Sequence, residues 1–124
     1  MKVRITGNKI RLRLKEPEVQ RLFKDEPIEE RLVFGQGTDQ QLVFKLQIGG
    51  LNQLSISYQP GAMIISMPKM FSETLAITDK VGYEDKIDTE NTMHIHLLIE
   101  KDFECLDAPE EANEGSYPNP KQIC

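Results

Sequence analysis

The sequence predicts a single α+β domain that is rich in β-structure, and three observations support this. A chain of 124 residues is long enough for one compact domain and leaves no room for a second. Alternation of apolar and polar residues with period 2 dominates the chain, and this pattern is typical of strands. Pro17 and Pro68 each precede apolar residues at helical spacing, and proline fits the first turn of a helix because its missing N–H costs little there.

Short turns connect the predicted elements. Gly7-Asn8 joins two alternating segments into an N-terminal hairpin with one apolar and one basic face, and Gln59-Pro60-Gly61-Ala62 has the residue order of a type II turn. The expected strands cover residues 2–6, 10–15, 28–34, 41–48, 54–58, 63–67, 81–87 and 93–99, and the expected helices cover 16–25 and 68–76. The connections between residues 41 and 67 are too short for crossovers, so these three strands are expected to form a meander of adjacent antiparallel strands.

Seven or eight strands and two short helices need an arrangement that closes the core. A flat sheet of this many strands would leave an apolar face bare. We therefore expect a strongly curved antiparallel sheet or an open barrel, with one or both helices plugging it. No internal repeat of useful length is visible. On the strand 28–34, Glu30 shares a face with Ile28 and Leu32, so this carboxylate must be paired or a bulge must break the register.

Charge is distributed unevenly along the chain. Residues 1–24 contain eight Lys or Arg and two Glu, a net charge of +6, and the remaining residues carry -11, which gives the overall -5. The pI of about 5.1 argues against a general nucleic-acid binder. No apolar run reaches the ~20 residues of a membrane helix, and no secretory signal is visible. Two cysteines are too few for a disulfide framework, so we expect a cytoplasmic protein with reduced thiols. The acidic pI and the lack of a long apolar run lead us to expect contact with neither nucleic acid nor membrane.

The domain is expected to end near residue 107. Residues 1–107 form the predicted globular domain, and residues 108–124 form an acidic tail that contains prolines and is expected to dock on it. Phe103 and Tyr117 flank the acidic stretch. Each ring is expected to pin the tail to the domain, although the same segment also suits recognition by a partner.

Five segments, spread over nearly the whole chain, carry a resemblance to a known family. They are residues 2–14, Glu29-Glu30-Arg31 with Phe34-Gly35, Val81-Gly82-Tyr83, residues 100–107 and Tyr117-Pro118-Asn119-Pro120. These segments resemble a family of small bacterial proteins known only as a domain of unknown function. The resemblance implies a stand-alone cytoplasmic bacterial protein whose tail belongs to the domain, and it implies no activity.

A weaker resemblance is to the triphosphate tunnel enzymes, which are antiparallel barrels lined with Arg, Lys and Glu. Their N-terminal Glu-x-Glu-x-Lys pattern is absent, because the first strand offers Lys2 and Arg4 and the nearest acidic pair is Glu29-Glu30. The sequence therefore does not support the metal-binding half of that mechanism.

The basic side chains are the main candidates for a binding site. Converging guanidinium groups suit a phosphate or carboxylate, because each fork can bind bidentately. Two competing interpretations are an ordinary solvated face and pairing with the chain's own acidic stretch from Glu100 to Glu114, and surface ion pairs of this kind are common. The candidate residues are Arg4, Arg11, Arg13 and Lys15 on one side of the hairpin, with Arg31 and Lys45 if their strands lie in the same sheet.

His94 and His96 are weak candidates for metal ligands. Two residues apart on a strand, they share one face, with Cys105 or Glu100 as an imaginable third ligand, but the cysteine spacing fits no common metal site. Cys105 has acidic neighbours, which raise the pKa of a thiol and oppose thiolate formation, so a packed structural cysteine is favoured over a nucleophile. No serine elbow or phosphate loop is present, and we expect no catalytic residue, metal or cofactor.

Two functional hypotheses remain. The favoured one is a small non-catalytic domain that binds an unidentified protein or a small anionic ligand through a basic strand face. The alternative is an enzyme that acts on a phosphorylated or carboxylated small molecule in a basic barrel interior, with Glu29 or Glu30 serving metal or proton transfer. The sequence does not specify the oligomeric state.

Overall fold

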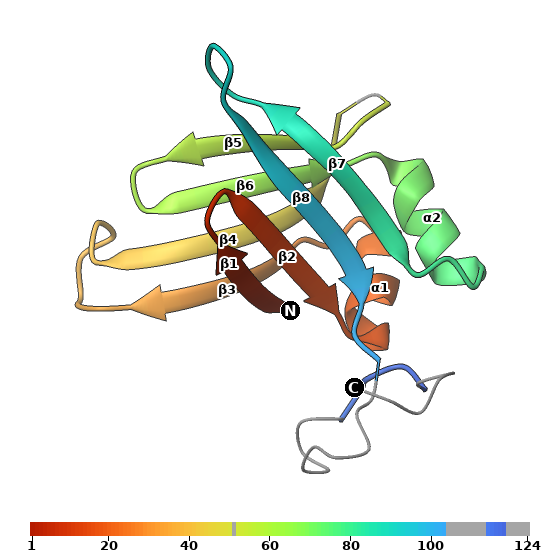
Figure 1. The fold of residues 1–124 in the computed structure, drawn as a ribbon. Coiled ribbons are helices and arrows are strands. Elements are labelled where there is room, and N and C mark those ends of the chain that lie inside the picture. The colour runs from red at the N-terminus through yellow and green to blue at the C-terminus, as the bar shows by residue number, and fades with distance from the viewer. Residues whose placement is uncertain (51, 104–113, 119–124) are drawn as a thin grey trace.

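The computed structural model describes residues 1–50, 52–103 and 114–118 of the chain (Figure 1). In this part of the chain, eight strands and two helices follow one another in the order β-β-α-β-β-β-β-α-β-β. The elements are β1 (Lys2–Thr6), β2 (Lys9–Leu14), α1 (Glu16–Phe23), β3 (Ile28–Val33), β4 (Gln41–Ile48), β5 (Ser55–Gln59), β6 (Ala62–Met67), α2 (Lys69–Ile77), β7 (Gly82–Asp88) and β8 (His94–Lys101). These bounds confirm the predicted β-rich α+β fold.

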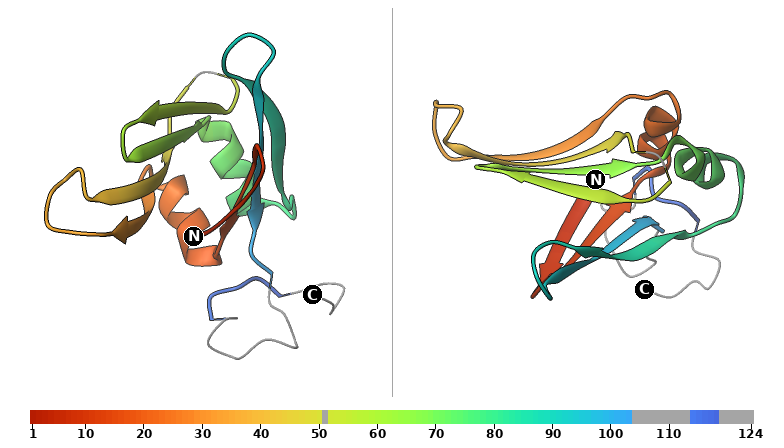
Figure 2. Two further views of the ribbon diagram at one scale, coloured as in Figure 1. Left: turned by 60° about the vertical axis from the view of Figure 1, so that its left-hand side comes forward. Right: turned by 90° about the horizontal axis from the view of Figure 1, so that it is seen from above.

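The strands form two separate four-stranded sheets instead of one curved sheet. Sheet A has the order β1-β2-β8-β7, and sheet B has the order β3-β4-β6-β5. In each sheet the two outer pairs are antiparallel and the central pair, β2 with β8 or β4 with β6, is parallel. Figure 2 shows that α1 and α2 lie together at one end of the molecule and that the two sheets diverge from them. The sheets therefore do not close into a barrel.

The core lies where the two sheets approach the helices. The side chains buried there come from both sheets and from both helices, so the helices fill the narrow end between the sheets as expected. Val19 and Leu22 on α1 and Leu75 on α2 are fully buried. In β2, β6 and β8 the buried residues alternate with more exposed ones, and this alternation fixes which side chains of these strands point outward. The buried strand residues are Ile10, Leu12, Leu14, Ile28, Leu46, Ile65, Met67, Leu97 and Ile99.

Local chemistry explains the ends of the elements. The carboxylate of Glu18 accepts a hydrogen bond of 2.9 Å from the backbone N–H of Lys15, which satisfies a donor at the start of α1. In the predicted turn between β5 and β6, Gly61 has a φ of +80°, and a Cβ there would lie 2.9 Å from the carbonyl oxygen of Gln41. This turn therefore needs glycine both for its conformation and for the close approach of β4.

The predicted meander of three adjacent antiparallel strands is wrong in part. β5 and β6 form the expected antiparallel hairpin, but β4 pairs with β6 in parallel, and β5 lies at the edge of sheet B. The connection from β4 to β5 runs past the end of β6. A short connection restricts how far the chain travels, but it does not require the two strands that it joins to be neighbours.

Glu30 is paired, as its position among apolar residues required. Its carboxylate lies 3.2 Å from the amino group of Met1, which also contacts Glu18. β3 pairs with β4 in continuous register from Ile28 to Val33, so no bulge is needed. The sequence pattern therefore identified a carboxylate with a structural partner.

The structure also contains a repeat that the sequence analysis did not find. Each half of the chain has the element order β-β-α-β-β. When 53 is added to the residue numbers of the first half, the bounds of most of its elements match those of the second half. The corresponding positions include Lys2 and Ser55, Lys9 and Ala62, Glu16 and Lys69, and Gln41 and His94. The cross-strand registers correspond as well: Lys2 pairs with Arg13 and Ser55 with Ser66, while Lys101 pairs with Leu14 and Ile48 with Met67.

The repeat is hidden because it preserves pattern more than identity. Apolar alternation is retained in the paired hairpins, while almost every residue differs. The correspondence of β3 with β7 needs a shift of 55 positions, from Ile28 to Tyr83, so a search at one fixed period fails there. With this shift the segments IEERLV and YEDKID share two acidic residues followed by a basic one at their second to fourth positions. The expectation of no internal repeat is thus corrected.

None of the helices in the described residues is long and apolar enough to span a membrane.

Candidate anion-binding site

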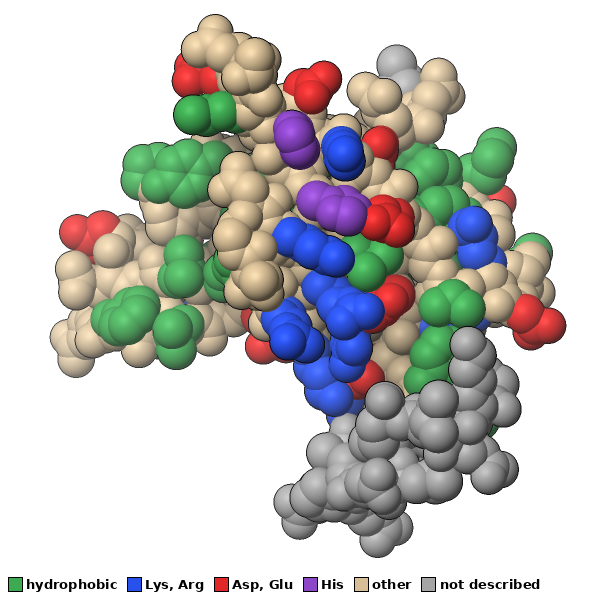
Figure 3. All heavy atoms as spheres, in the orientation of Figure 1, with side chains coloured by type: hydrophobic (Ala, Val, Ile, Leu, Met, Phe, Trp, Pro, Cys, Tyr) green, Lys and Arg blue, Asp and Glu red, His purple; other side chains and the backbone are tan. Residues whose placement is uncertain are grey.

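Basic side chains gather on the outer face of sheet A. We call this surface the basic face, and it consists of Lys2, Arg4, Lys9, Arg11 and Arg13. These residues alternate along β1 and β2 with the apolar residues that point into the core, so the pleat directs them away from sheet B. Figure 3 shows the Lys and Arg side chains as one group on this side of the molecule. Arg4, Arg11 and Arg13 are therefore brought together, as the sequence predicted for this hairpin.

Like charges face each other directly across β1 and β2. Lys2 is opposite Arg13, and Arg4 is opposite Arg11. Like charges at directly opposed positions destabilise a strand pair, by an amount on the order of 0.2–1 kcal/mol for each pair. The arrangement therefore opposes folding of the hairpin unless nearby anions offset it.

Two carboxylates at the end of β8 offset part of this charge. The Oε1 atom of Glu100 lies 3.1 Å from Nε of Arg13, which donates a hydrogen bond to it, and 2.7 Å from Nε of Arg11. The Arg11 atom is not aligned for a hydrogen bond, so that contact is ionic. Nζ of Lys2 lies 2.9 Å from Oδ2 of Asp102, whose side chain is buried. These contacts belong to the acidic stretch that the sequence offered as an internal partner.

Arg4 and Lys9 form no ion pair with any carboxylate of the described residues. They line an open hollow of about 260 Å³ together with Thr6 and Arg11. Two carboxylates against five cations leave three positive charges on the basic face. The hollow thus combines guanidinium, ammonium and hydroxyl donors, which is the donor set that suits a phosphate or carboxylate group.

Lys15, Arg31 and Lys45 do not join this group. Lys15 precedes α1, where its side chain packs near Gly115. Arg31 and Lys45 lie in sheet B, so the condition under which the sequence placed them at the site is not met. The guanidinium group of Arg31 donates a hydrogen bond of 2.9 Å to Oε2 of Glu29 and one of 2.8 Å to Oε1 of Gln41. Lys2 and Lys9 were missed, although the same period-2 alternation that identified the arginines also marks them.

The catalytic alternative required a basic interior, and the geometry does not provide one. The two sheets form no closed barrel, and Lys101 is the one basic side chain that is buried among the described residues. Arg4, Arg11 and Arg13 instead point outward on sheet A. Glu29 lies on sheet B, where it pairs with Arg31, and Glu30 contacts the amino group of Met1.

His94 and His96 also lie on the outer face of sheet A, beyond the basic face in Figure 3. Nε2 of His96 contacts the carboxylate of Glu84 on β7. No group of three or more His, Cys, Asp or Glu side chains that is suitable for a metal occurs among the described residues. Cys105 lies outside those residues, so its predicted structural role is not described.

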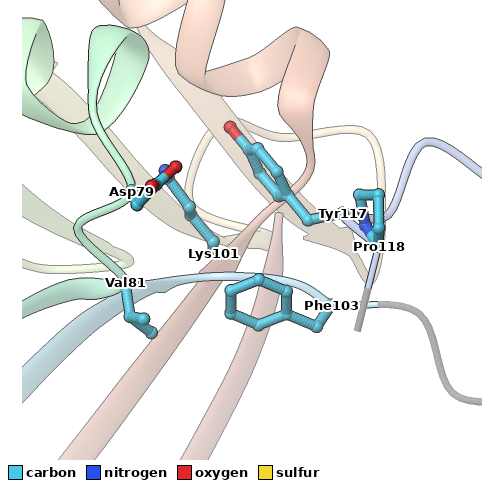
Figure 4. Close-up of a pocket in the computed structure, with 6 residues that line it drawn as sticks. All are labelled: Asp79, Val81, Lys101, Phe103, Tyr117 and Pro118. Atoms are coloured by element: carbon cyan, nitrogen blue, oxygen red, sulfur yellow. The ribbon is translucent and has the colours of Figure 1, made fainter. Parts of the chain in front are cut away.

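A second cavity, of about 470 Å³, lies beside the described part of the tail (Figure 4). Its lining is mostly apolar, and one buried cation, Lys101, takes part in it. Nζ of Lys101 donates a hydrogen bond of 2.9 Å to the carbonyl oxygen of Thr78 and lies 5.0 Å from the ring centroid of Tyr117. A cation at the C-terminal end of a helix is stabilised by the helix dipole, so these contacts give Lys101 a structural role between α2 and Tyr117.

Tyr117 contacts the end of β8 through its backbone and its ring. Its N–H donates a hydrogen bond of 2.7 Å to the carbonyl oxygen of Asp102, and its ring centroid lies 5.9 Å from that of Phe103. Burial, reinforced by the nearby carboxylate of Glu16, raises the pKa of the Tyr117 hydroxyl to about 12. The backbone N–H of Glu16 also donates a hydrogen bond to the carbonyl oxygen of Gly115. Residues 114–118 thus touch both β8 and α1.

Comparison with known families places the chain in one of them. The model of a family described as "Family of unknown function (DUF7009)" matches residues 1–121. The chain belongs to this family. No curated protein and no solved structure matches this chain.

The DUF7009 match covers both sheets and both helices, and it extends over the described part of the tail. The family description assigns no activity, so membership confirms the predicted family resemblance without identifying a ligand. Functional inference therefore rests on the geometry of the basic face.

Proposed function

We propose that this DUF7009 domain is a non-catalytic binding domain whose basic face binds a phosphate or carboxylate group. The group belongs to a small anionic ligand or to an anionic patch of a partner protein. In keeping with the resemblance to bacterial proteins, we propose the bacterial cytoplasm as the place of this function. We assign residues 1–107 to the binding domain, and the described tail residues Gly115 and Tyr117 contact it through hydrogen bonds with Glu16 and Asp102.

The main support is the hollow between Arg4 and Arg11. Arg4 and Arg11 occupy directly opposite positions on the neighbouring strands β1 and β2. Arg4 has no carboxylate partner in the described part of the chain. Lys9 and Thr6 add donors to the same hollow. A bound anion would sit between like charges and replace their repulsion with two attractive contacts, so an arrangement that weakens the free domain strengthens the complex.

The internal carboxylates support the choice of ligand class. Glu100 contacts Arg11 and Arg13 through its carboxylate, and these internal contacts support a carboxylate or phosphate as the ligand group. Arg11 remains partly exposed on the side that faces the hollow, with about a third of its side chain accessible. An anion in the hollow can therefore reach Arg11, where it would compete with the carboxylate of Glu100 for the same guanidinium group.

Isothermal titration calorimetry of the full chain tests the proposal. The probes are inorganic phosphate, pyrophosphate, citrate and a short polyglutamate peptide, each at low and at high salt. We expect one of these anions to bind, with an affinity that falls as the salt concentration rises. The double variant Arg4→Ala/Lys9→Ala should lose about tenfold or more in affinity, since hydrogen bonds to charged groups contribute about 1.5–3 kcal/mol each.

The matched control is Lys24→Ala/Lys45→Ala, which removes the same charge outside the basic face. This variant should bind the anion nearly as well as the unmodified chain. Absence of binding to every probe, or equal losses in the two double variants, would overturn the proposal.

A further inference from the structure

The four edge strands of the two sheets differ in how they are protected. A free edge presents unpaired N–H and C=O groups, and natural proteins usually guard it with charged side chains or proline. β1 carries Lys2 and Arg4, β3 carries an acidic pair and Arg31, and β7 has four charged residues. β5, with the sequence SISYQ, has no charged residue.

The unprotected edge belongs to a hairpin that is neutral throughout. Residues 54–67, which comprise both β5 and β6, include no Asp, Glu, Lys or Arg. Tyr58 is a large aromatic residue with 78% of its surface exposed, although it alternates in phase with the buried Leu54. An uncharged edge next to an exposed aromatic side chain is the feature that natural sheets avoid unless the edge is paired.

The geometry of the hairpin shows which backbone groups face outward. In a hairpin with a two-residue turn, the pair that flanks the turn is hydrogen-bonded, and this pair is Gln59 with Ala62. Because hydrogen-bonded pairs alternate along an antiparallel ladder, Ser57 and Ser55 also bond to β6. Ile56 and Tyr58 therefore direct their N–H and C=O groups to the edge of sheet B, where no strand of the described residues pairs with β5.

We propose that β5 pairs in antiparallel fashion with β5 of a second copy of this chain, around a twofold axis at Ser57. This register places Ile56 of each copy opposite Tyr58 of the other, and both pairs use the outward backbone groups. Two four-stranded sheets B become one sheet of eight strands. The same axis keeps the apolar faces of both copies on one side.

A second copy fits this edge better than an unrelated strand does. Antiparallel pairing of a strand with itself is self-complementary, so each Tyr58 gains a β-branched neighbour, a favourable cross-strand pair. No like charges meet, because β5 and β6 contribute none. The basic face lies on the other sheet, so the pairing does not depend on the proposed anion site.

Sedimentation velocity of the full chain over a range of concentrations tests the proposal. We expect a monomer–dimer equilibrium. The variant Ser57→Lys should weaken dimerisation at least tenfold, because the two new lysines would face each other across the axis. Thr38→Lys, which adds the same charge in the turn after β3, is the matched control and should dimerise like the unmodified chain. Thermal unfolding followed by circular dichroism at the lowest concentration verifies that each variant is folded.

A second variant separates loss of pairing from loss of folding. Tyr58→Pro removes an outward N–H and leaves the hydrogen bonds to β6 in place, so it should yield a folded monomer. A chain that stays monomeric up to its solubility limit would overturn the proposal. So would a dimer that persists in both β5 variants, or an assembly larger than a dimer.

Discussion

The hairpins β1–β2 and β5–β6 hold the same position in their respective sheets. Each supplies an edge strand and one of the two central parallel strands of its sheet. In each hairpin a two-residue turn joins the two strands, and the second strand leads into a helix. Their apolar residues correspond, since Leu12 and Ile65 are both fully buried. Their outward residues do not. The five basic residues of the first hairpin correspond to Ser55, Ser57, Ala62, Ile64 and Ser66 of the second.

This difference separates what forms the hairpin from what the hairpin presents. The inward side chains are apolar in both copies, so they account for the shared fold. The outward side chains are free to differ, and one hairpin carries five charged residues while the other carries none. We infer that the first half of the repeat serves a ligand or partner that carries negative charge, whereas the second suits contact between neutral surfaces.

The largest expected effect concerns the shared inward positions. Leu12→Ala and Ile65→Ala should each lower the free energy of unfolding by about 2–5 kcal/mol, because each leaves a cavity in a close-packed core. Urea denaturation followed by circular dichroism measures the loss. If the two hairpins are energetically equivalent, the losses should agree within about 1 kcal/mol. A large loss for only one of them would confine the equivalence to topology.

A smaller effect is expected where an ion pair in one half corresponds to a neutral contact in the other. Glu100 holds Arg13, and the corresponding residues Gln47 and Ser66 are joined by a hydrogen bond of 3.3 Å. Glu100→Gln should cost about 1–2 kcal/mol, because it leaves opposed cations without their main carboxylate. It should also raise the affinity for an anionic probe in calorimetry, since an internal competitor is removed.

Gln47→Ala is the control for this comparison. It removes a neutral hydrogen bond from the equivalent position, so the loss of stability should be about half as large, and the affinity for the anion should not change. Unchanged anion affinity in the Glu100→Gln variant would indicate that Glu100 does not compete with a ligand for the arginines.

Removal of one charge from the basic face should stabilise the protein slightly. Arg4 faces Arg11 and has no carboxylate partner among the described residues, whereas the corresponding Ser57 is neutral. Arg4→Gln should therefore raise the free energy of unfolding by about 0.2–1 kcal/mol at low salt, and the gain should shrink as salt is added. Lys24→Gln removes the same charge away from opposed cations and should give no such gain. Equal effects in both variants would point to net charge as the cause.

Local patterns were sufficient to predict the elements but not their pairing. The period-2 segments and the two prolines located all eight strands and both helices to within a few residues. Pairing depends on which distant strands meet, and neither the parallel contact of β2 with β8 nor that of β4 with β6 has a local signature. The repeat would have helped, since it relates the two contacts, but its side chains have diverged too far to show it.

The same limit explains the outcome for the site. Alternation along one hairpin brought Arg4, Arg11 and Arg13 to one face, because residues two apart on a strand always share a face. Adding Arg31 and Lys45 required knowledge of which sheet holds β3 and β4, and that information is not local. The role of Glu100 was accessible in outline, since the uneven distribution of charge already indicated an acidic partner at the end of the chain.

The smallest expected effect concerns a contact at the end of β8. Lys101 corresponds to Ile48, and of these two residues only Lys101 packs against Tyr117 in the part of the tail that the structure describes. Since the pKa of Tyr117 is about 12 in the folded chain and about 10 in an unfolded one, the unfolded state loses this proton first. The free energy of unfolding should thus fall as the pH rises from about 10 to about 12, and the Tyr117 hydroxyl should not affect it below that range.

The variant Tyr117→Phe should reduce this loss of stability at high pH, and Tyr58→Phe is the control. Urea denaturation at several pH values measures the loss. If the loss is the same in both variants, Tyr117 does not contribute a buried hydroxyl to the folded state.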